Sequence, residues 1–198
     1  MPPKLLLEKV GLRYGLQPLF EGVTVSMQGG EAWAITGPNG SGKSSLLAIV
    51  AGYLHPSHGR VVREGSKLSW QSPHVQPPPD LLVSDILRDW RRYKEMSLSK
   101  DFAVQWALPE HKPFYTLSSG MRQRLLTGLA LSLTQGIVLL DEPTAFLDEP
   151  HRRHIHGLLR QRIGEPQLLI LCATNDPEEA SLFPKCLHLP SYAPDRRV

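Results

Sequence analysis

The sequence predicts an α/β fold in which a mostly parallel sheet is covered by helices on both faces. Three observations support this prediction. Apolar runs alternate with helical patterns along the second half of the chain, as is typical of parallel sheets. A glycine-rich loop joins an apolar strand expected at 32–36 to a helix expected at 44–51. The most apolar expected strand, 137–140, ends in two carboxylates. The 198 residues suffice for one domain with a small subdomain.

The glycine-rich loop has the G-x-x-x-x-G-K-[ST] pattern of a phosphate-binding loop. It consists of Gly37, Pro38, Asn39, Gly40, Ser41, Gly42, Lys43, Ser44 and Ser45. Its glycines let backbone N–H groups approach phosphate oxygens, and the following helix points its positive end at them. Lys43 supplies a charge for the outer phosphates, and the Ser44 hydroxyl can hold Mg²⁺. The strand–loop–helix setting agrees with the motif, so we expect a nucleotide to bind here.

The N-terminal part is expected to form short strands. We predict strands at 4–10 and 23–28, on either side of a turn-rich segment that holds Tyr14, Gly15, Pro18 and Phe20. After the first helix, which Gly52 and Pro56 end, two more strands are expected at 59–62 and 67–70. The N-terminal strands therefore make a β subdomain, which we expect to be antiparallel, ahead of the main sheet.

The middle of the chain reads as a helical insert. Prolines at 73 and 77–79 exclude a helix from 71–80. Helices are then predicted at 82–94 and 99–107, and a shift in composition at 109–113 ends the insert. We interpret about 72–120 as a short helical subdomain within a single domain that spans 1–198.

The last third continues the alternation. Helices are predicted at 118–134, 149–163 and 177–183, and strands at 137–140, 167–173 and 186–189. The helix at 149–163 carries many His and Arg residues, which suit either a solvated face or a metal or anion site. Its amphipathic pattern favours the solvated face.

Composition limits the class of protein. The net charge of +3 is too weak to indicate nucleic-acid binding, so no nucleic-acid partner is expected. No apolar run approaches the length of a membrane span, and the N-terminus lacks a signal peptide's apolar core. Cys172 and Cys186 both lie in apolar segments, which predicts buried, reduced thiols in a cytosolic protein.

Polar residues follow three expected strands, where open α/β sheets bind their ligands. Asp141 is placed to hold Mg²⁺, directly or through water, and Glu142 can orient or deprotonate a water molecule. The alternative is that this acidic pair only caps the following segment. Asn175 could bind a γ-phosphate or cap the next helix, and its position in the sequence favours neither role over the other. Gln71, also at a strand end, would by itself be a surface amide.

The order of these motifs resembles the ATP-binding subunit of ABC transporters, a P-loop NTPase, over nearly the whole chain. The segment 117–123 (Leu-Ser-Ser-Gly-Met-Arg-Gln) resembles the family's L-S-G-G-Q signature, and 145–148 resembles its D-loop. An apolar strand ending in Asp141 is the Walker B pattern. Gln71 falls at the Q-loop glutamine, and Tyr14 where an aromatic ring stacks on adenine.

The resemblance implies a head-to-tail homodimer that hydrolyses ATP to energise a membrane-embedded transporter. ATP would lie between the phosphate-binding loop of one subunit and Ser118, Ser119 and Gly120 of the other. Ser44, Gln71 and Asp141 would serve Mg²⁺, and Glu142 would be the catalytic base. The membrane subunit would dock near the Q-loop and the insert, about 72–94. The chain would thus be cytoplasmic, bound through that partner to the inner face of the cell membrane.

Three departures from the family pattern bear on the rate of hydrolysis. Ser119 replaces a signature glycine, Met121 replaces the signature glutamine, and Asn175 stands at the switch histidine and cannot carry a proton. The chain is also short, similar in that respect to the ATP-binding subunits of haem-export complexes.

Two alternative functions stay open. A soluble ABC-type ATPase of DNA repair, cohesion or translation is disfavoured because the insert has no sustained heptads and the chain has one nucleotide domain. A weakly hydrolysing, ATP-dependent scaffold fits the altered signature and Asn175, whereas Glu142 argues against it.

Overall fold

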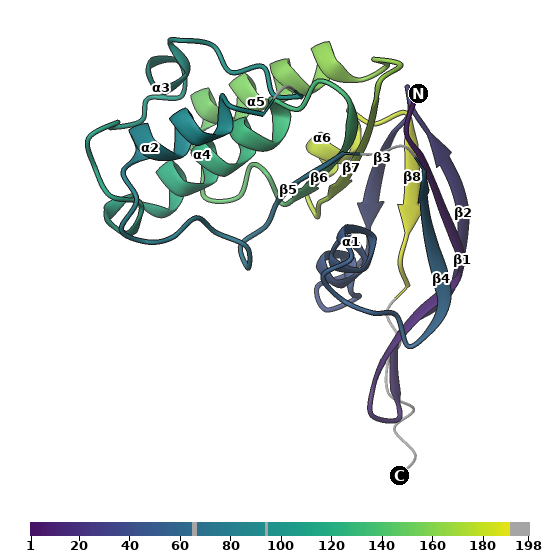
Figure 1. The fold of residues 1–198 in the computed structure, drawn as a ribbon. Coiled ribbons are helices and arrows are strands. Elements are labelled where there is room, and N and C mark those ends of the chain that lie inside the picture. Colours follow the sequence, from purple (N-terminus) through teal and green to yellow (C-terminus); the bar gives the residue numbers. More distant parts are fainter. Residues whose placement is uncertain (65–66, 94, 191–198) are drawn as a thin grey trace.

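A three-stranded antiparallel sheet and a five-stranded parallel sheet form the β structure of the computed structural model (Figure 1). The structure describes residues 1–64, 67–93 and 95–190. The antiparallel sheet has the order β2 (Gln17–Gln28), β1 (Lys4–Tyr14), β4 (His58–Glu64). The parallel sheet has the order β5 (Leu68–Gln71), β6 (Gly136–Asp141), β7 (Leu168–Ala173), β3 (Ala32–Thr36), β8 (Lys185–His188).

Helices cover both faces of the parallel sheet. On one face lie α2 (Val83–Trp90), α3 (Phe102–Gln105), α4 (Ser119–Leu131) and α5 (Glu149–Arg162), and α1 (Lys43–Ala51) lies on the other (Figure 1). The 3₁₀ turn η1 (Phe114–Thr116) precedes α4, and the short helix α6 (Pro177–Ala180) follows β7. In Figure 1 the antiparallel sheet lies beyond α1, on the side opposite the α2–α5 group.

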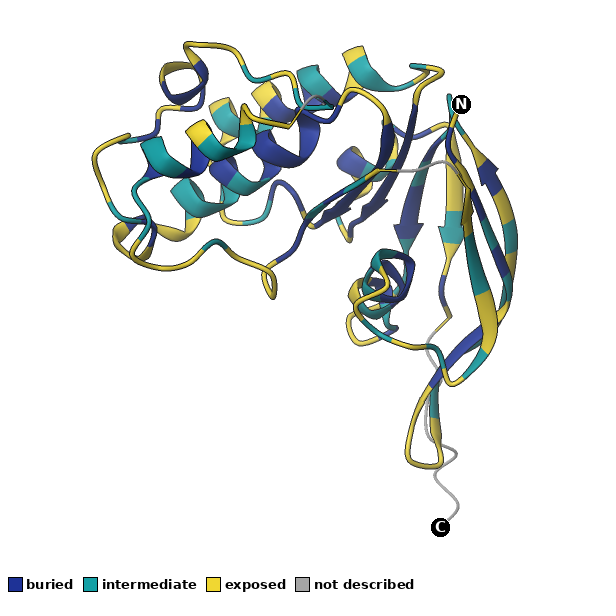
Figure 2. Cartoon of the chain, viewed as in Figure 1, coloured by how far each residue is buried: buried dark blue, intermediate teal, exposed yellow. Residues whose placement is uncertain are grey.

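The central strands divide the core into two clusters. Successive side chains of a strand point to opposite faces. In β6, Val138 and Leu140 accordingly pack with α2–α5, whereas Ile137 and Leu139 pack with α1 and the antiparallel sheet. All residues of β6 and β7 are buried (Figure 2). Burial on both faces explains why these strands are continuous apolar runs.

The predicted fold class and the strand–loop–helix setting are confirmed, but four helices are shorter than expected. The helices predicted at 118–134 and 177–183 span only Ser119–Leu131 and Pro177–Ala180. The helix predicted at 82–94 ends at Trp90, and the chain turns through Arg91–Tyr93; Lys94 lies outside the described residues. The helix predicted at 99–107 has only four residues. Ala107 adopts a left-handed φ of 48° and the Leu108 N–H bonds to the Ala103 carbonyl at 2.8 Å, which closes this helix early.

The turn-rich segment predicted around Tyr14 to Phe20 is wrong. β1 runs to Tyr14 and β2 begins at Gln17, so a tight hairpin turn occupies only Gly15 and Leu16. Pro18 pairs with Arg13 in this ladder. A proline is tolerated there because β2 is an edge strand of its sheet.

Two predictions about side-chain burial are only half right. Cys172 is buried, but Cys186 is exposed, since its strand β8 lies at the edge of the parallel sheet. The His/Arg face of α5 is not fully solvated either. His156 is 2% exposed and faces α6, because α6 folds back onto this side of α5. Among the described residues, no helix combines the length and apolarity that crossing a bilayer requires.

Candidate nucleotide site

The phosphate-binding loop follows β3 and folds back on itself before α1. Gly37 and Gly42 have φ of 147° and 94°, in the left-handed range that favours glycine. A Cβ at Gly37 would lie 2.3 Å from the Leu189 carbonyl oxygen, and one at Gly42 would lie 2.7 Å from Cδ1 of Phe20. The loop conformation therefore requires glycine at both positions. Gly42 is also the N-cap of α1 and supplies no side-chain cap, so the first N–H groups of this helix can bind a ligand.

Lys43 turns its ammonium group back into the loop. Its Nζ donates to the carbonyls of Gly37 at 2.9 Å and Pro38 at 3.2 Å. The residue is 6% exposed, and this burial lowers the pKa of the amine, while the nearby carboxylates of Glu142 and Asp141 raise it again. A cation held in this way is poised for an anionic ligand of the loop, to which its hydrogen bonds can transfer.

Asp141 lies at the end of β6, beside the first turn of α1. Its Oδ1 accepts a hydrogen bond from the Ser44 hydroxyl at 2.9 Å. Its backbone N–H donates to Oε1 of Gln71 at 2.8 Å, which joins the ends of β5 and β6. Burial raises the pKa of Asp141, the Ser44 hydrogen bond offsets part of this rise, and repulsion from Glu142 adds to it. The ends of β5 and β6 and the start of α1 are thus joined through the backbone and the carboxylate of Asp141.

Glu142 and Asn175 face the loop from neighbouring strand ends. Asn175 Nδ2 donates to Oδ1 of Asn39 at 2.5 Å and to Oε1 of Glu142 at 3.2 Å. Glu142 has a left-handed φ of 49°, which directs the chain out of β6, and its N–H bonds to the Ala173 carbonyl. The cap of α6 is Asp176, whose carboxylate accepts from the Glu178 and Glu179 N–H groups. Asn175 is therefore free of the capping role and lies between the loop and Glu142.

The phosphate-binding loop, Gln71, the acidic pair and Asn175, each predicted from a separate motif, thus lie together in one site. A family model described as ABC transporter matches residues 20–145, more than half of the chain. The chain belongs to the ABC transporter family. It is an ATP-binding component of that family, an ATPase whose hydrolysis of ATP energises transport.

Curated relatives match most of this ABC cassette. The "Probable iron export ATP-binding protein FetA" of Escherichia coli K12 is 29% identical, over 96% of this chain and 93% of its own. The "Cytochrome c biogenesis ATP-binding export protein CcmA" of Mesorhizobium japonicum is 34% identical, over 79% of this chain and 84% of its own.

Solved structures share the fold of the cassette. The ATP-binding cassette MJ0796, in a dimeric post-hydrolysis state bound to ADP and Pi, aligns with a TM-score of 0.79 and 20% identity, over 96% of this chain and 97% of its own. An ATP-binding subunit of an ABC transporter aligns with a TM-score of 0.80 and 18% identity, over 96% of this chain and 88% of its own.

The signature segment of the cassette caps α4. Ser118 is the N-cap of α4, and its Oγ accepts from the Met121 N–H at 3.2 Å. A Cβ at Gly120 would lie 3.2 Å from the Phe146 carbonyl oxygen, so this end of α4 packs against the D-loop. Within the described part of the chain, no hydrogen bond or ion pair joins 118–120 to the phosphate-binding loop. The exposed Ser118 and Ser119 are thus open to another molecule.

Tyr14 ends β1 at the hairpin and is 63% exposed. The β2 strand of the same hairpin carries Leu19 and Phe20, which would contact a Cβ at Gly42. The β2 strand of the hairpin thus adjoins the phosphate-binding loop at Leu19 and Phe20, whereas the exposed Tyr14 lies further along the hairpin, next to its turn. A stacking role for Tyr14 stays a prediction.

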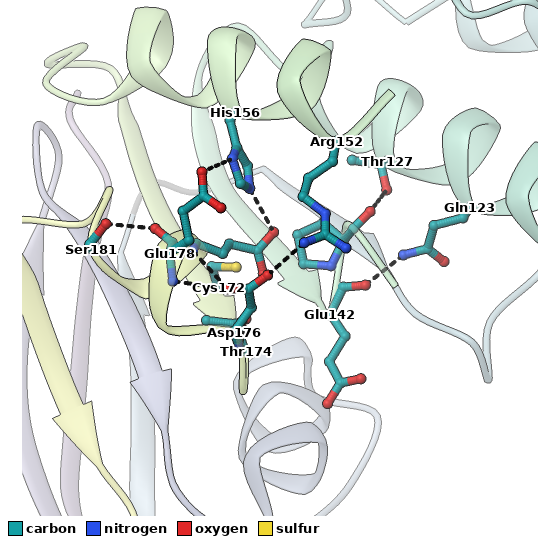
Figure 3. A network of polar contacts seen from close by, with 12 residues as sticks. Gln123, Thr127, Glu142, Arg152, His156, Cys172, Thr174, Asp176, Glu178 and Ser181 are labelled. Carbon is teal, nitrogen blue, oxygen red and sulfur yellow. Dashed lines mark hydrogen bonds and ion pairs between the residues drawn. The ribbon is translucent and has the colours of Figure 1, made fainter. Parts of the chain in front are cut away.

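Gln123 is a site residue to which sequence reasoning assigned no role. Its Nε2 donates to the Glu142 carbonyl at 2.7 Å, and so ties α4 to the backbone of the acidic pair (Figure 3). The neighbouring Thr127 donates from Oγ1 to the Pro143 carbonyl. Their spacing of four residues on one helix face was the only available signal, and it does not identify the partner.

Proposed function

We propose that this cassette hydrolyses Mg-ATP with Glu142 as the base, in a dimer that completes each site with the partner's signature segment. The observation that carries this proposal is the convergence of Lys43, Asp141, Glu142 and Asn175 at the carboxyl ends of β3, β6 and β7. Four groups of complementary chemistry meet where open α/β sheets bind ligands.

Mg²⁺ would be held by Asp141 and Ser44. Oδ2 of Asp141 is buried and has no hydrogen-bond partner within the described residues, while Oδ1 is already joined to the Ser44 hydroxyl. A carboxylate and a hydroxyl oxygen are the hard ligands that suit this ion, so the residues fit it. When bound, Mg²⁺ supplies charge neutralisation between the outer phosphates. The Oε1 of Gln71 bonds to the Asp141 backbone, so a direct contact from Gln71 would have to replace that hydrogen bond.

The residues around Glu142 divide the work of hydrolysis. The loop N–H groups and Lys43 bind the phosphates of ATP. The Glu142 carboxylate accepts a proton from a water molecule whose oxygen attacks the γ-phosphorus, while the bond from that phosphorus to the β–γ bridging oxygen breaks and ADP leaves. Asn175 orients that carboxylate through its Nδ2 and can donate to the γ-phosphate, but it cannot carry a proton.

The dimer would be head-to-tail. Ser118, Ser119 and Gly120 sit at the positive N-terminal end of α4, a ready site for phosphate, yet none of them contacts the loop of the same chain in the part that the structure describes. A second copy in the opposite orientation would bring this end of α4 to the γ-phosphate. The D-loop beside Gly120 would lie at the same interface.

A membrane-embedded subunit would dock beside the Q-loop, at about 72–94. A cavity of about 320 Å³ opens there between the segment after β5 and the helices α2 and α4. Apolar residues line much of it, among them Val75, Pro77, Leu81 and Trp90. We propose that the helical subdomain of about 72–120 belongs to one domain spanning 1–198, whose last residues, 191–198, are not described. The chain would then act at the cytoplasmic face of the membrane.

The dimer can be tested with the Glu142→Gln variant, which should bind ATP without hydrolysing it. Size-exclusion chromatography with light scattering should show a dimer in Mg-ATP and a monomer in ADP. The matched control adds Ser119→Asp, because an acid suits the start of a helix but repels a partner's phosphate. This double variant should bind ATP and stay monomeric. A Glu142→Gln protein that binds Mg-ATP only as a monomer would contradict the dimer.

A further inference from the structure

The D-loop, residues 145–148, is attached to α4 just before it begins. Gln123 Nε2 donates to the Glu142 carbonyl at 2.7 Å, and Thr127 Oγ1 donates to the Pro143 carbonyl at 3.3 Å (Figure 3). Both bonds end on backbone carbonyls, and an amide or a hydroxyl donor does not titrate near neutral pH. This first attachment is therefore insensitive to pH.

Where the D-loop ends, a chain of three side chains attaches it to α4 a second time. Asp148, the last residue of the loop, is the N-cap of α5, and its Oδ1 accepts from the His151 N–H at 3.2 Å. The same Oδ1 contacts Nδ1 of the His151 ring, and Nε2 of that ring contacts Nη1 of Arg124 in α4. Arg124 thus reaches the D-loop carboxylate through the ring of His151.

These contacts require one form of the His151 ring. An arginine nitrogen can only donate, so Nε2 must accept and carry no proton, while Nδ1–H donates to the Asp148 carboxylate. The partners on both sides therefore assign the neutral ring with its proton on Nδ1. A second proton, on Nε2, would set two donors against each other, and the contact with Arg124 would be lost.

The three side chains form a charged network that is partly open to water. Arg124 is 8% exposed, and burial lowers the pKa of its guanidinium, while the Asp148 carboxylate offsets part of this fall. The His151 side chain is 31% exposed, so a proton from solvent can reach it. His154, on the same helix, also interacts with His151. The other charged residues at the start of α5 pair elsewhere, Glu149 with Arg153 and Arg152 with Asp176.

The backbone between the two attachments is strained. Phe146 has a left-handed φ of 63°, which is rare for a residue with a bulky side chain, and its ring is 81% exposed. Such a conformation persists only where the surrounding structure imposes it. The two attachments to α4 supply this restraint, so the loss of one should let the loop relax.

We propose that His151 is a positioning residue that fixes the D-loop to α4, so that protonation of its ring weakens the dimer. The Phe146 carbonyl oxygen lies 3.2 Å from the position of a Cβ on Gly120, so the D-loop and the signature segment form one surface. A surface that is already ordered binds its partner at a lower entropic cost. The inference rests on the proposed function, because this is the surface that a second copy would meet.

The test measures the dissociation constant of the Glu142→Gln dimer in Mg-ATP, with and without His151→Gln. Glutamine keeps one donor for Asp148 and one acceptor for Arg124, but it gains no proton in mild acid. At about pH 7.5 the two dimers should be equally tight within about twofold. On acidification to about pH 5.5, the dissociation constant should rise about tenfold more without His151→Gln than with it. Every other titrating group, ATP included, is common to both proteins.

Two more variants in the Glu142→Gln background serve as controls. His154→Gln makes the same change three positions along α5 and should leave the pH profile of the dimer as it was. His151→Leu removes the bridge at every pH and should weaken the dimer about tenfold even at about pH 7.5. A fluorescent ADP analogue should bind all of the monomers equally at each pH, since His151 lies outside the phosphate-binding loop.

The inference is overturned if the dimers with and without His151→Gln respond equally to acid, or if His151→Leu dimerises as tightly as its parent. The comparison with His151→Gln decides the matter even if His151→Leu does not fold. A Glu142→Gln protein that binds Mg-ATP only as a monomer at about pH 7.5 would be a different failure. The proposed dimer itself would then be wrong, and the inference would fall with it.

Discussion

At the scale of single residues, the site contains ionisable side chains whose charged forms are disfavoured by burial. Asp141 is 6% exposed, burial raises its pKa, and the adjacent Glu142 repels it. Lys43 is likewise buried, and its pKa is lowered. Burial therefore opposes the charged form of both side chains, although these charges suit the Mg-ATP that we propose as the ligand. Buried charges of this kind are expected at positions where the residue is required for function and not for folding.

Replacing Lys43 by Ala should remove the charge that the loop holds for the outer phosphates. We expect ATP affinity to fall at least about tenfold and turnover to become undetectable, as a lost charged hydrogen bond implies. Equilibrium binding of a fluorescent ATP analogue and phosphate release measure the two effects. Unchanged ATPase activity would be inconsistent with the assignment of this loop.

Asp141→Asn should stabilise the nucleotide-free chain by about 1 kcal/mol while it abolishes Mg-dependent turnover. Asparagine keeps an oxygen for the Ser44 hydroxyl but carries no buried charge. Because the folded-state pKa of Asp141 is raised, stability from this group is full below its unfolded pKa and is lost as pH rises through the folded value. The gain over the unchanged chain should therefore appear at neutral pH and vanish in acid. Urea unfolding of both proteins at several pH values measures this gain. A variant and an unchanged chain of equal stability at every pH would contradict the prediction.

Asn175→His tests the switch position. Histidine can donate to a γ-phosphate as asparagine does, and it can also become positively charged. We expect the variant to hydrolyse ATP faster below about pH 6.5, where the imidazole is charged, and so to acquire a pH dependence that the unchanged chain lacks there. Phosphate release between pH 5.5 and 8 would be measured for both. Superimposable pH profiles would exclude a role for Asn175 at the γ-phosphate.

At the scale of elements, close backbone approaches hold the antiparallel sheet in register. Gly59 of β4, with φ of 79°, meets the bulge at Lys9 of β1, which is itself at φ of 49°. A Cβ at Gly59 would lie 2.3 Å from the Lys9 carbonyl oxygen and 2.4 Å from that of Glu8. Gly15, at the tip of the β1–β2 hairpin, has a similar φ of 61° but open space around it.

Alanine substitution at Gly15 and at Gly59 separates two causes of lost stability: a left-handed backbone, which both positions share, and steric overlap of the new Cβ with the β1 backbone, which only Gly59 has. Gly15→Ala should cost about 1 kcal/mol, the penalty of a left-handed φ. Gly59→Ala should cost about 3 kcal/mol or more, because the carbonyls of β1 must also move. Urea denaturation gives both values. Equal losses would mean that the bulge relaxes without cost.

The elements also show what the sequence could and could not predict. Strands β6 and β7 and the loop at Lys43 were predictable because apolar runs and a phosphate motif are local signals. The β1–β2 hairpin was not, since Gly15 and Pro18 together suggested a long turn, whereas the turn occupies only Gly15 and Leu16 and β2 continues through Pro18. The burial of His156 and Glu179 depends on α6 folding onto α5, a contact between segments that no local pattern encodes. The exposure of Cys186 follows in the same way from the edge position of β8.

At the scale of the whole molecule, the phosphate-binding loop and the signature segment are not joined by a hydrogen bond within the described residues. The phosphate-binding loop lies at the carboxyl ends of β3, β6 and β7, while the signature segment begins α4 and packs against the D-loop. Both motifs were visible in the sequence, and the resemblance to the family already implied that they would serve different sites, although no local pattern encodes their separation. This separation supports a function that depends on a second copy and on the movement between copies.

The most direct test of the central claim is the steady-state Mg-ATPase activity of the purified chain beside its Glu142→Gln variant. If Glu142 is the base, phosphate release should fall at least about hundredfold in the variant, while ATP affinity stays within about twofold. An unchanged rate in Glu142→Gln would contradict the assignment, because the Glu142 carboxylate would then take no part in the activation of water.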